Sequence, residues 1–169
     1  MEIKRQAQQV FEQISCLLEK LDNSRYHQSL KILNGSTLGQ HIRHIYCFYK
    51  CLIDGVETGI VNYDKRVRDT LIETNVFHSK IALESIDSKI QRLDVSQQLI
   101  IISNKTIDPP YSDGLKSSAG RELLYATDHS IHHLALLKIG VSSCFPEIEV
   151  EENMGVAPST IEYKNTCAQ

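Results

Sequence analysis

The residues best suited to chemistry are two groups of histidines, His41 with His44 and His129 with His132 and His133. In a helix, residues four apart differ by only about 40° around the axis, so His129 and His133 project from one face. Their separation along the axis is about 6 Å, and two imidazoles at this spacing can converge on one divalent metal ion. His132 points about 60° away and is better suited to a supporting or surface position.

A third ligand could come from the helix expected between Ser36 and Glu57, where His44 and Cys51 lie at the edge of the apolar face. A ligand at this edge can complete a metal site and still leave one side of the ion open to solvent. Three imidazoles leave coordination positions free for water or a substrate, which is the pattern of catalytic sites. The alternative is that these histidines are ordinary core or surface groups. For Cys51 we favour a small core residue, and Cys47 is expected on the wet face.

Other candidate catalytic residues are Tyr125, Arg66 and Arg68. Tyr125 lies one turn before His129 and could orient a ligand or donate a proton, or it could be a core tyrosine. The arginines lie in a polar segment that could fold over the metal and bind a carboxylate or phosphate, or form a solvated loop. Glu122, about 10 Å from His129 along the axis, is too distant to be a ligand. We interpret it first as an acid favoured by the helix dipole.

The elements that must position these residues are mainly helical. Apolar residues recur at helical spacing from Ile3 to Leu21, and further helices are expected at 36–57, 75–93 and 117–140. Ser36 or Thr37 can cap the second helix, Asn75 or Thr74 the third, and Gly140 is expected to end the fourth. Residues 59–70 are interpreted as a loop. The β-branched run 99–102, followed by Pro109 and Pro110, predicts a short strand that could be half of a hairpin.

Composition indicates one soluble domain over residues 1–169, with 41% hydrophobic and 23% charged residues. A net charge of −3 gives no general attraction to nucleic acid or to an anionic membrane. No segment approaches the roughly 20 apolar residues of a membrane helix, and the start of the chain does not resemble a signal peptide. Five scattered cysteines suggest reduced thiols and a cytoplasmic location.

Two segments resemble motifs of the DinB-like superfamily: residues 36–45 (STLGQHIRHI) and residues 128–135 (DHSIHHLA). The resemblance covers essentially the whole chain. It implies an all-α, up-down-down-up four-helix bundle with a three-histidine metal site. Within the Gln-x-x-x-His-Ile motif it assigns His44, not His41, as the ligand, together with His129 and His133.

Relatives in that superfamily include metal-dependent transferases and isomerases that use low-molecular-weight thiols. The three-histidine pattern favours an enzyme that binds one divalent ion (zinc, nickel or iron) and activates a thiol or water for transfer, isomerisation or hydrolysis on a small substrate, as a thiol transferase, isomerase or hydrolase. A similar bundle also occurs in sulfoxide synthases of thiohistidine biosynthesis, but this chain lacks their large second domain. The alternative is a non-catalytic, metal-stabilised bundle with a stress-response or interaction role. By analogy with the family, a homodimer is expected.

Overall fold

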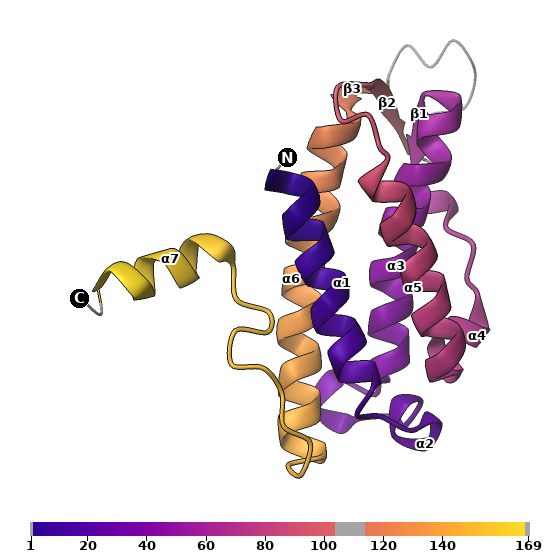
Figure 1. Ribbon diagram of the computed structural model, residues 1–169. Helices are drawn as coiled ribbons and strands as arrows, with labels where there is room; N and C mark the ends of the chain where they lie inside the picture. The colour runs from indigo at the N-terminus through magenta and orange to yellow at the C-terminus, as the bar shows by residue number, and fades with distance from the viewer. Residues whose placement is uncertain (1, 104–113, 168–169) are drawn as a thin grey trace.

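The computed structural model describes residues 2–103 and 114–167, and these are predominantly α-helical with a small sheet at one end (Figure 1). Four long helices lie side by side: α1 (Glu2–Leu18), α3 (Leu38–Thr58), α5 (Val76–Gln91) and α6 (Ala119–Cys144). In Figure 1, α1 and α6 run downward and α3 and α5 run upward. The shorter elements are α2 (Asn23–Tyr26), α4 (Thr70–Thr74), α7 (Pro158–Cys167) and the 3₁₀ turns η1 (Lys31–Leu33) and η2 (Tyr63–Lys65).

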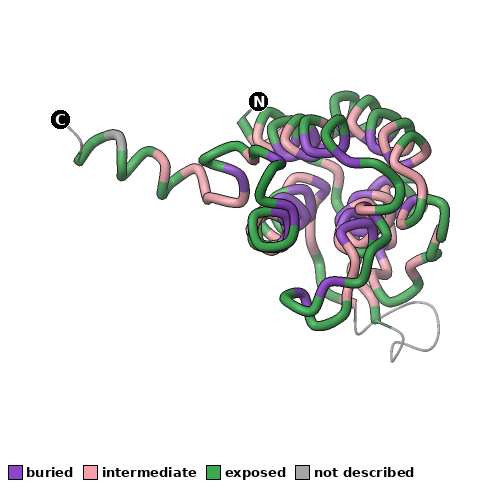
Figure 2. The backbone as a smooth tube through the Cα atoms, turned by 90° about the horizontal axis from the view of Figure 1, so that it is seen from below, coloured by how far each residue is buried: buried purple, intermediate pink, exposed green. Residues whose placement is uncertain are grey.

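The core lies between the four long helices, whose buried faces turn toward one another when viewed along their axes (Figure 2). Each helix contributes an apolar stripe at helical spacing, such as Val10, Phe11 and Ile14 of α1. The ring of Phe11 lies 4.7 Å from that of Tyr49 on α3. Tyr49 is fully buried, and its hydroxyl donates to Thr127 on α6. Helix α7 stands apart from this core (Figure 1).

The start of α3 fixes the position of its histidines. The Thr37 side chain accepts from the Gln40 backbone N–H, and the Gln40 side chain accepts from the Thr37 backbone N–H. This reciprocal capping box satisfies two backbone donors and settles the choice between Ser36 and Thr37. One residue inside the helix, Gly39 faces the backbone of Glu73 so closely that an added Cβ would lie 2.0 Å from the Glu73 carbonyl oxygen. The missing side chain therefore lets α4 pack directly against α3.

A three-stranded sheet joins the ends of the long helices, so the fold is predominantly α, as expected, with a small sheet that includes the anticipated hairpin. Strand β2 (Gln98–Ile102) pairs antiparallel with β3 (Leu115–Ser118), with Leu99 opposite Ser117. This confirms the strand predicted at 99–102; Pro109 and Pro110 lie outside the described residues. Strand β1 (Ile60–Asn62) pairs parallel with β2 on its other side.

Two sequence predictions of element boundaries are wrong. Residues 59–70 are not a plain loop, because they form β1 and η2 and reach the start of α4. Gly140 does not end the fourth predicted helix, which is α6 and continues to Cys144. A Cβ on Gly140 would lie 2.9 Å from a methyl of Leu33 and 3.3 Å from one of Leu38. Gly140 therefore serves close packing and not helix termination. Among the described residues, no helix combines the length and apolarity needed to cross a membrane.

Gly39→Ala tests the contact between α3 and α4. The added methyl group must displace the Glu73 backbone, and overpacking of this kind costs about 1–3 kcal/mol. We expect the free energy of unfolding, measured by urea denaturation, to fall by about this amount. Glu57→Ala, at an exposed position of the same helix, is the control and should change it little. Equal stability of the two variants would contradict the close contact.

Candidate metal centre

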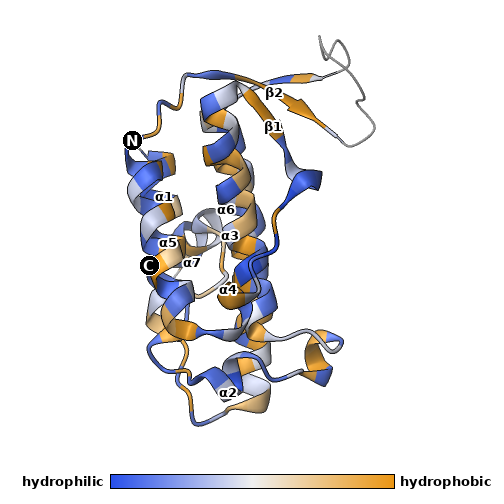
Figure 3. Cartoon of the chain, turned by 90° about the vertical axis from the view of Figure 1, so that its right-hand side faces the viewer, coloured by the Kyte–Doolittle hydropathy of each residue, from blue (hydrophilic) through white to orange (hydrophobic). Residues whose placement is uncertain are grey.

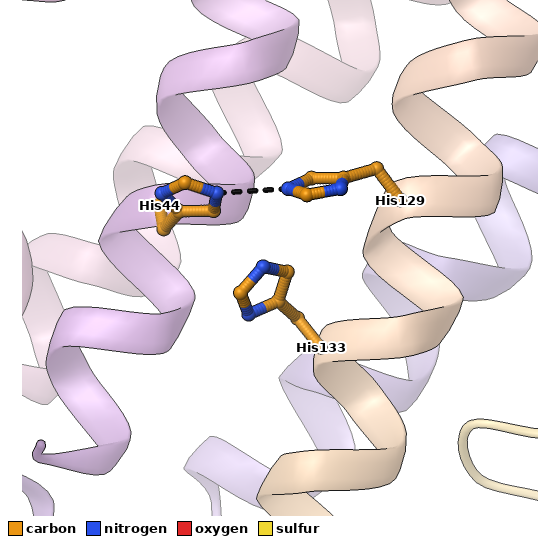
Figure 4. A group of neighbouring side chains, drawn as sticks. All are labelled: His44, His129 and His133. Atoms are coloured by element: carbon orange, nitrogen blue, oxygen red, sulfur yellow. Dashed lines mark hydrogen bonds between the residues drawn. The ribbon is translucent and has the colours of Figure 1, made fainter. Parts of the chain in front are cut away.

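Three histidines converge between α3 and α6. His44 comes from α3, and His129 and His133 come from successive turns of α6; Figure 4 shows their rings directed into the space between the two helices. Each offers one ring nitrogen, and the three nitrogens lie within 4.8 Å of one another. No carboxylate or cysteine joins this group among the residues that the structure describes. The three residues predicted as metal ligands are thus brought together, with no fourth protein ligand among them.

The spacing of the donor atoms fits a small divalent ion. The Nε2 atoms of His44 and His129 are 2.8 Å apart (Figure 4), and the ring centroids of His44 and His133 are 4.5 Å apart. Zinc–nitrogen bonds of about 2.0 Å at tetrahedral angles place two ligand nitrogens about 3.3 Å apart. The His44–His129 separation is within about half an ångström of that value. Small side-chain rotations would therefore suffice to accommodate an ion.

The electrostatics of the triad keep its imidazoles neutral. Burial, reinforced by the neighbouring histidines, lowers the pKa of His44 to about 4 and that of His133 to about 3. The pKa of His129 is lowered for the same main reason. A neutral imidazole has a free lone pair for a metal, whereas a protonated one has none. The cluster is consequently in its ligating form at neutral pH.

His41 supports the triad from one side. Its Nδ1 lies 2.9 Å from Nδ1 of His133, so a hydrogen bond fixes the orientation of the His133 ring and leaves Nε2 of His133 available. Nε2 of His41 is itself buried and has no partner among the described residues. His132 is exposed and stacks edge-on against His133, as expected for a residue that is not a ligand. The role of His41 was not apparent from helix spacing, because the contact crosses between helices.

A hollow of about 230 Å³ opens beside the triad, lined by Ser36, Gln40, His41, Arg43, His44 and His133. The Arg43 guanidinium on its wall binds Glu73 of α4 at 2.6 Å, and both side chains are largely buried. The hollow gives a small molecule access to two of the three candidate ligands. Its polar lining is compatible with water or a polar substrate.

On the other side of the triad, aromatic rings form a wall. Phe48 lies 4.3 Å from the His129 ring, Tyr63 stacks on Phe48 at 5.2 Å, and Tyr125 stacks near His129 at 6.1 Å. Tyr125 is 40% exposed, and its hydroxyl makes no hydrogen bond within the described part of the chain. Tyr125 is therefore not the buried core tyrosine that the sequence analysis gave as the alternative.

The segment between β1 and α4 runs alongside α3 as a largely hydrophilic strip (Figure 3). It brings Arg66 to the site, with the guanidinium carbon 5.1 Å from the centre of the Phe48 ring. Arg68, in contrast, is exposed and has no contact with the aromatic wall. Arg66 and Arg68 are only two positions apart in the sequence, yet only Arg66 reaches the site. Val67, the residue between them, lies over α3.

Glu122 anchors this segment. It is 3% exposed, and its carboxylate accepts hydrogen bonds from the hydroxyls of Tyr63 at 2.8 Å and Ser117 at 2.5 Å. Burial and the Glu122 carboxylate raise the pKa of Tyr63, which therefore stays a hydrogen-bond donor. Glu122 does lie in the first turn of α6, as the dipole argument requires, but its main role is to join η2 and β3 to that helix.

The position of Cys47 differs from the prediction because the same segment covers its side chain. Its side chain was expected on the wet face of α3, yet it is 4% exposed and its Sγ lies 3.5 Å from the Val67 carbonyl oxygen. Burial raises the pKa of the Cys47 thiol and raises that of Cys51 to about 11. Both thiols therefore remain protonated at neutral pH, and neither belongs to the histidine cluster.

The lowered histidine pKa values predict an acid-sensitive metal-free protein. Below pH 6.5 the unfolded chain takes up protons on His44 and His133, whereas the folded chain takes them up only near pH 4 and 3. We expect the free energy of unfolding in EDTA to fall from pH 7 to pH 4. The fall should be shallower for His133→Asn, as measured by urea denaturation at each pH. Identical pH dependence of parent and variant would contradict the assignment.

Tyr63→Phe tests the anchor at Glu122. Removal of the hydroxyl leaves a buried carboxylate with one donor fewer, which costs about 1–3 kcal/mol. We expect this loss in the free energy of unfolding. Tyr163→Phe, at a 68% exposed tyrosine of α7, provides the matched control and should be neutral. A neutral Tyr63→Phe would show that the Glu122 contact contributes little.

No protein-family model matches the chain, and no solved structure matches it. It is similar to FK506-binding protein 5 of Rhizopus delemar, with 32% identity over 108 residues, which is 62% of the chain and 27% of that protein. The chain thus spans about a quarter of the length of this curated relative. The match does not show a family for the chain. The candidate metal centre therefore rests on the geometry of its three histidines.

Proposed function

We propose that this chain is a DinB-like four-helix bundle that binds one divalent metal ion through His44, His129 and His133 and acts on a small substrate. The observation that carries the proposal is the convergence of three neutral imidazoles, within 4.8 Å, with no fourth protein ligand in the described chain. The directions of α1, α3, α5 and α6 support the bundle. The reaction is a thiol transfer, an isomerisation or a hydrolysis.

The bound ion supplies Lewis acidity, which lowers the pKa of a coordinated water or thiol. Residues of the chain supply ligand orientation, substrate access and proton donation. His41 holds His133 in its ligating orientation, and the hollow beside His44 admits the substrate. The hydroxyl of Tyr125 would donate a proton to a substrate atom near His129. Three imidazoles suit zinc, nickel and iron, so the donor set selects a class of ions and not one metal.

The alternative role, an ion that only fastens α3 to α6, has less support. These helices already share a dry interface, because Leu38, Ile42 and Ile45 of α3 and Leu134 and Leu137 of α6 are fully buried. Such an interface holds the helices without a metal ion. In addition, purely structural zinc sites have four protein ligands, whereas the described residues provide three. Both observations favour a metal site with a coordination position that water or a substrate can occupy.

Elemental analysis of the purified protein tests the proposal. We expect about one zinc, nickel or iron ion per chain, and almost none in a His129→Ala/His133→Ala variant. His132→Ala is the matched control, since it removes an exposed histidine from between the two ligands and should retain the metal.

Two further results would contradict parts of the proposal. Metal-free parent protein, even after incubation with each ion, would remove the metal centre. A collapse of the melting temperature on chelation, with no exchangeable coordination position, would instead support the fastening role. The catalytic role requires a modest change in melting temperature and an exchangeable position.

A further inference from the structure

We propose that the substrate of this centre carries an anionic group, a carboxylate or a phosphate, and that Arg66 binds that group beside the metal ion. The inference rests on the proposed function, because it assigns the substrate class of the same site.

Arg66 lies one aromatic ring away from the histidines. Its guanidinium is 5.1 Å from the centre of Phe48, and Phe48 is 4.3 Å from the ring of His129 and 5.0 Å from that of His44. A guanidinium on an aromatic face leaves its N–H groups pointing outward at the ring edge, where they can hydrogen-bond a carboxylate or phosphate.

Charge at the centre is unbalanced in the positive direction. Three neutral imidazoles leave the full double charge of a divalent ion uncompensated. Of the acids nearby, Glu73 is paired with Arg43, and Glu122 is occupied by the hydroxyls of Tyr63 and Ser117. Arg66 has no carboxylate partner among the described residues, although it is half-buried. A partly desolvated cation without a counter-ion is costly, and an anionic substrate would offset that cost.

The segment that carries Arg66 is held at both ends. Before Arg66, the Tyr63 hydroxyl binds Glu122 and the Asn62 side chain caps η2 by accepting from the Asp64 backbone N–H. After it, the Asp69 side chain caps α4. Arg66 is therefore presented to the site before any ligand arrives, and little conformational entropy is lost when an anion binds.

Cobalt-substituted protein and three small thiols test the proposal. 3-Mercaptopropionate, 2-mercaptoethanol and cysteamine share a thiol that can coordinate Co²⁺, but they carry a negative, a neutral and a positive tail. Binding is followed by the thiolate–cobalt absorption band, which reports coordination without any assay of activity. We expect the anionic thiol to bind the parent roughly tenfold to a hundredfold more tightly than the neutral one, and cysteamine to bind most weakly.

Arg66→Gln should abolish this preference while the cobalt content stays at the parent level. Lys65→Gln, which removes an exposed charge from the same segment, is the matched control and should keep the preference. Competition by acetate and by inorganic phosphate then distinguishes a carboxylate from a phosphate as the substrate group. The competitor that resembles this group should displace 3-mercaptopropionate from the parent and should not displace it from Arg66→Gln.

The outcomes separate the two proposals. Equal binding of the three thiols by the parent would overturn the anionic substrate and leave the metal centre standing. A preference that persists in Arg66→Gln would overturn the role of Arg66. Failure to bind cobalt would overturn the proposed function itself, whereas an unchanged spectrum with all three thiols would overturn a thiol substrate and with it the role of Arg66 that this experiment tests.

Discussion

The antiparallel packing of α3 against α6 is the constraint on which the site depends. Because the two helices run in opposite directions, a short stretch of α3 faces successive turns of α6, and His44 is placed opposite His129 and His133. The shared dry interface fixes this register, since sliding one helix by a turn would bury polar residues and expose apolar ones. The histidines therefore lie together as a consequence of the apolar packing on either side of them.

A second constraint follows from the directions of the helices. Neighbouring helices α3 and α5 run the same way, so the chain must return along the length of α3 before α5 can begin. The returning segment forms β1 at one end and α4 at the other, where Gly39 admits the Glu73 backbone. Between these ends it covers Cys47 and carries Arg66 to the aromatic wall. The connection thus adds Tyr63 and Arg66 to the groups that α3 and α6 place around the triad.

Much of the framework and two of the three clustered histidines could be predicted from local periodicity, whereas the choice of His44 over His41 came from the resemblance of residues 36–45 to a known motif. Helical spacing of apolar residues located the long helices, and the spacing of four placed His129 and His133 on one face. What could not be predicted depends on contacts between distant segments. Strand β1 exists only because it pairs with β2, Gly140 is selected by Leu33 and Leu38, and the contacts of Arg66 and Glu122 cross between elements. Single-sequence patterns carry no signal for such pairings.

The returning segment has a consequence for how such a site can change over evolutionary time. The helices carry the three histidines and most of the groups around them, such as Phe48 and Tyr125, whereas residues 63–69 add Tyr63 and Arg66. Under the proposed function, a substitution at Arg66 would alter the preferred substrate, because this half-buried side chain lies outside the apolar core. Substrate preference would then vary at a position that contributes little to the packing of the helices.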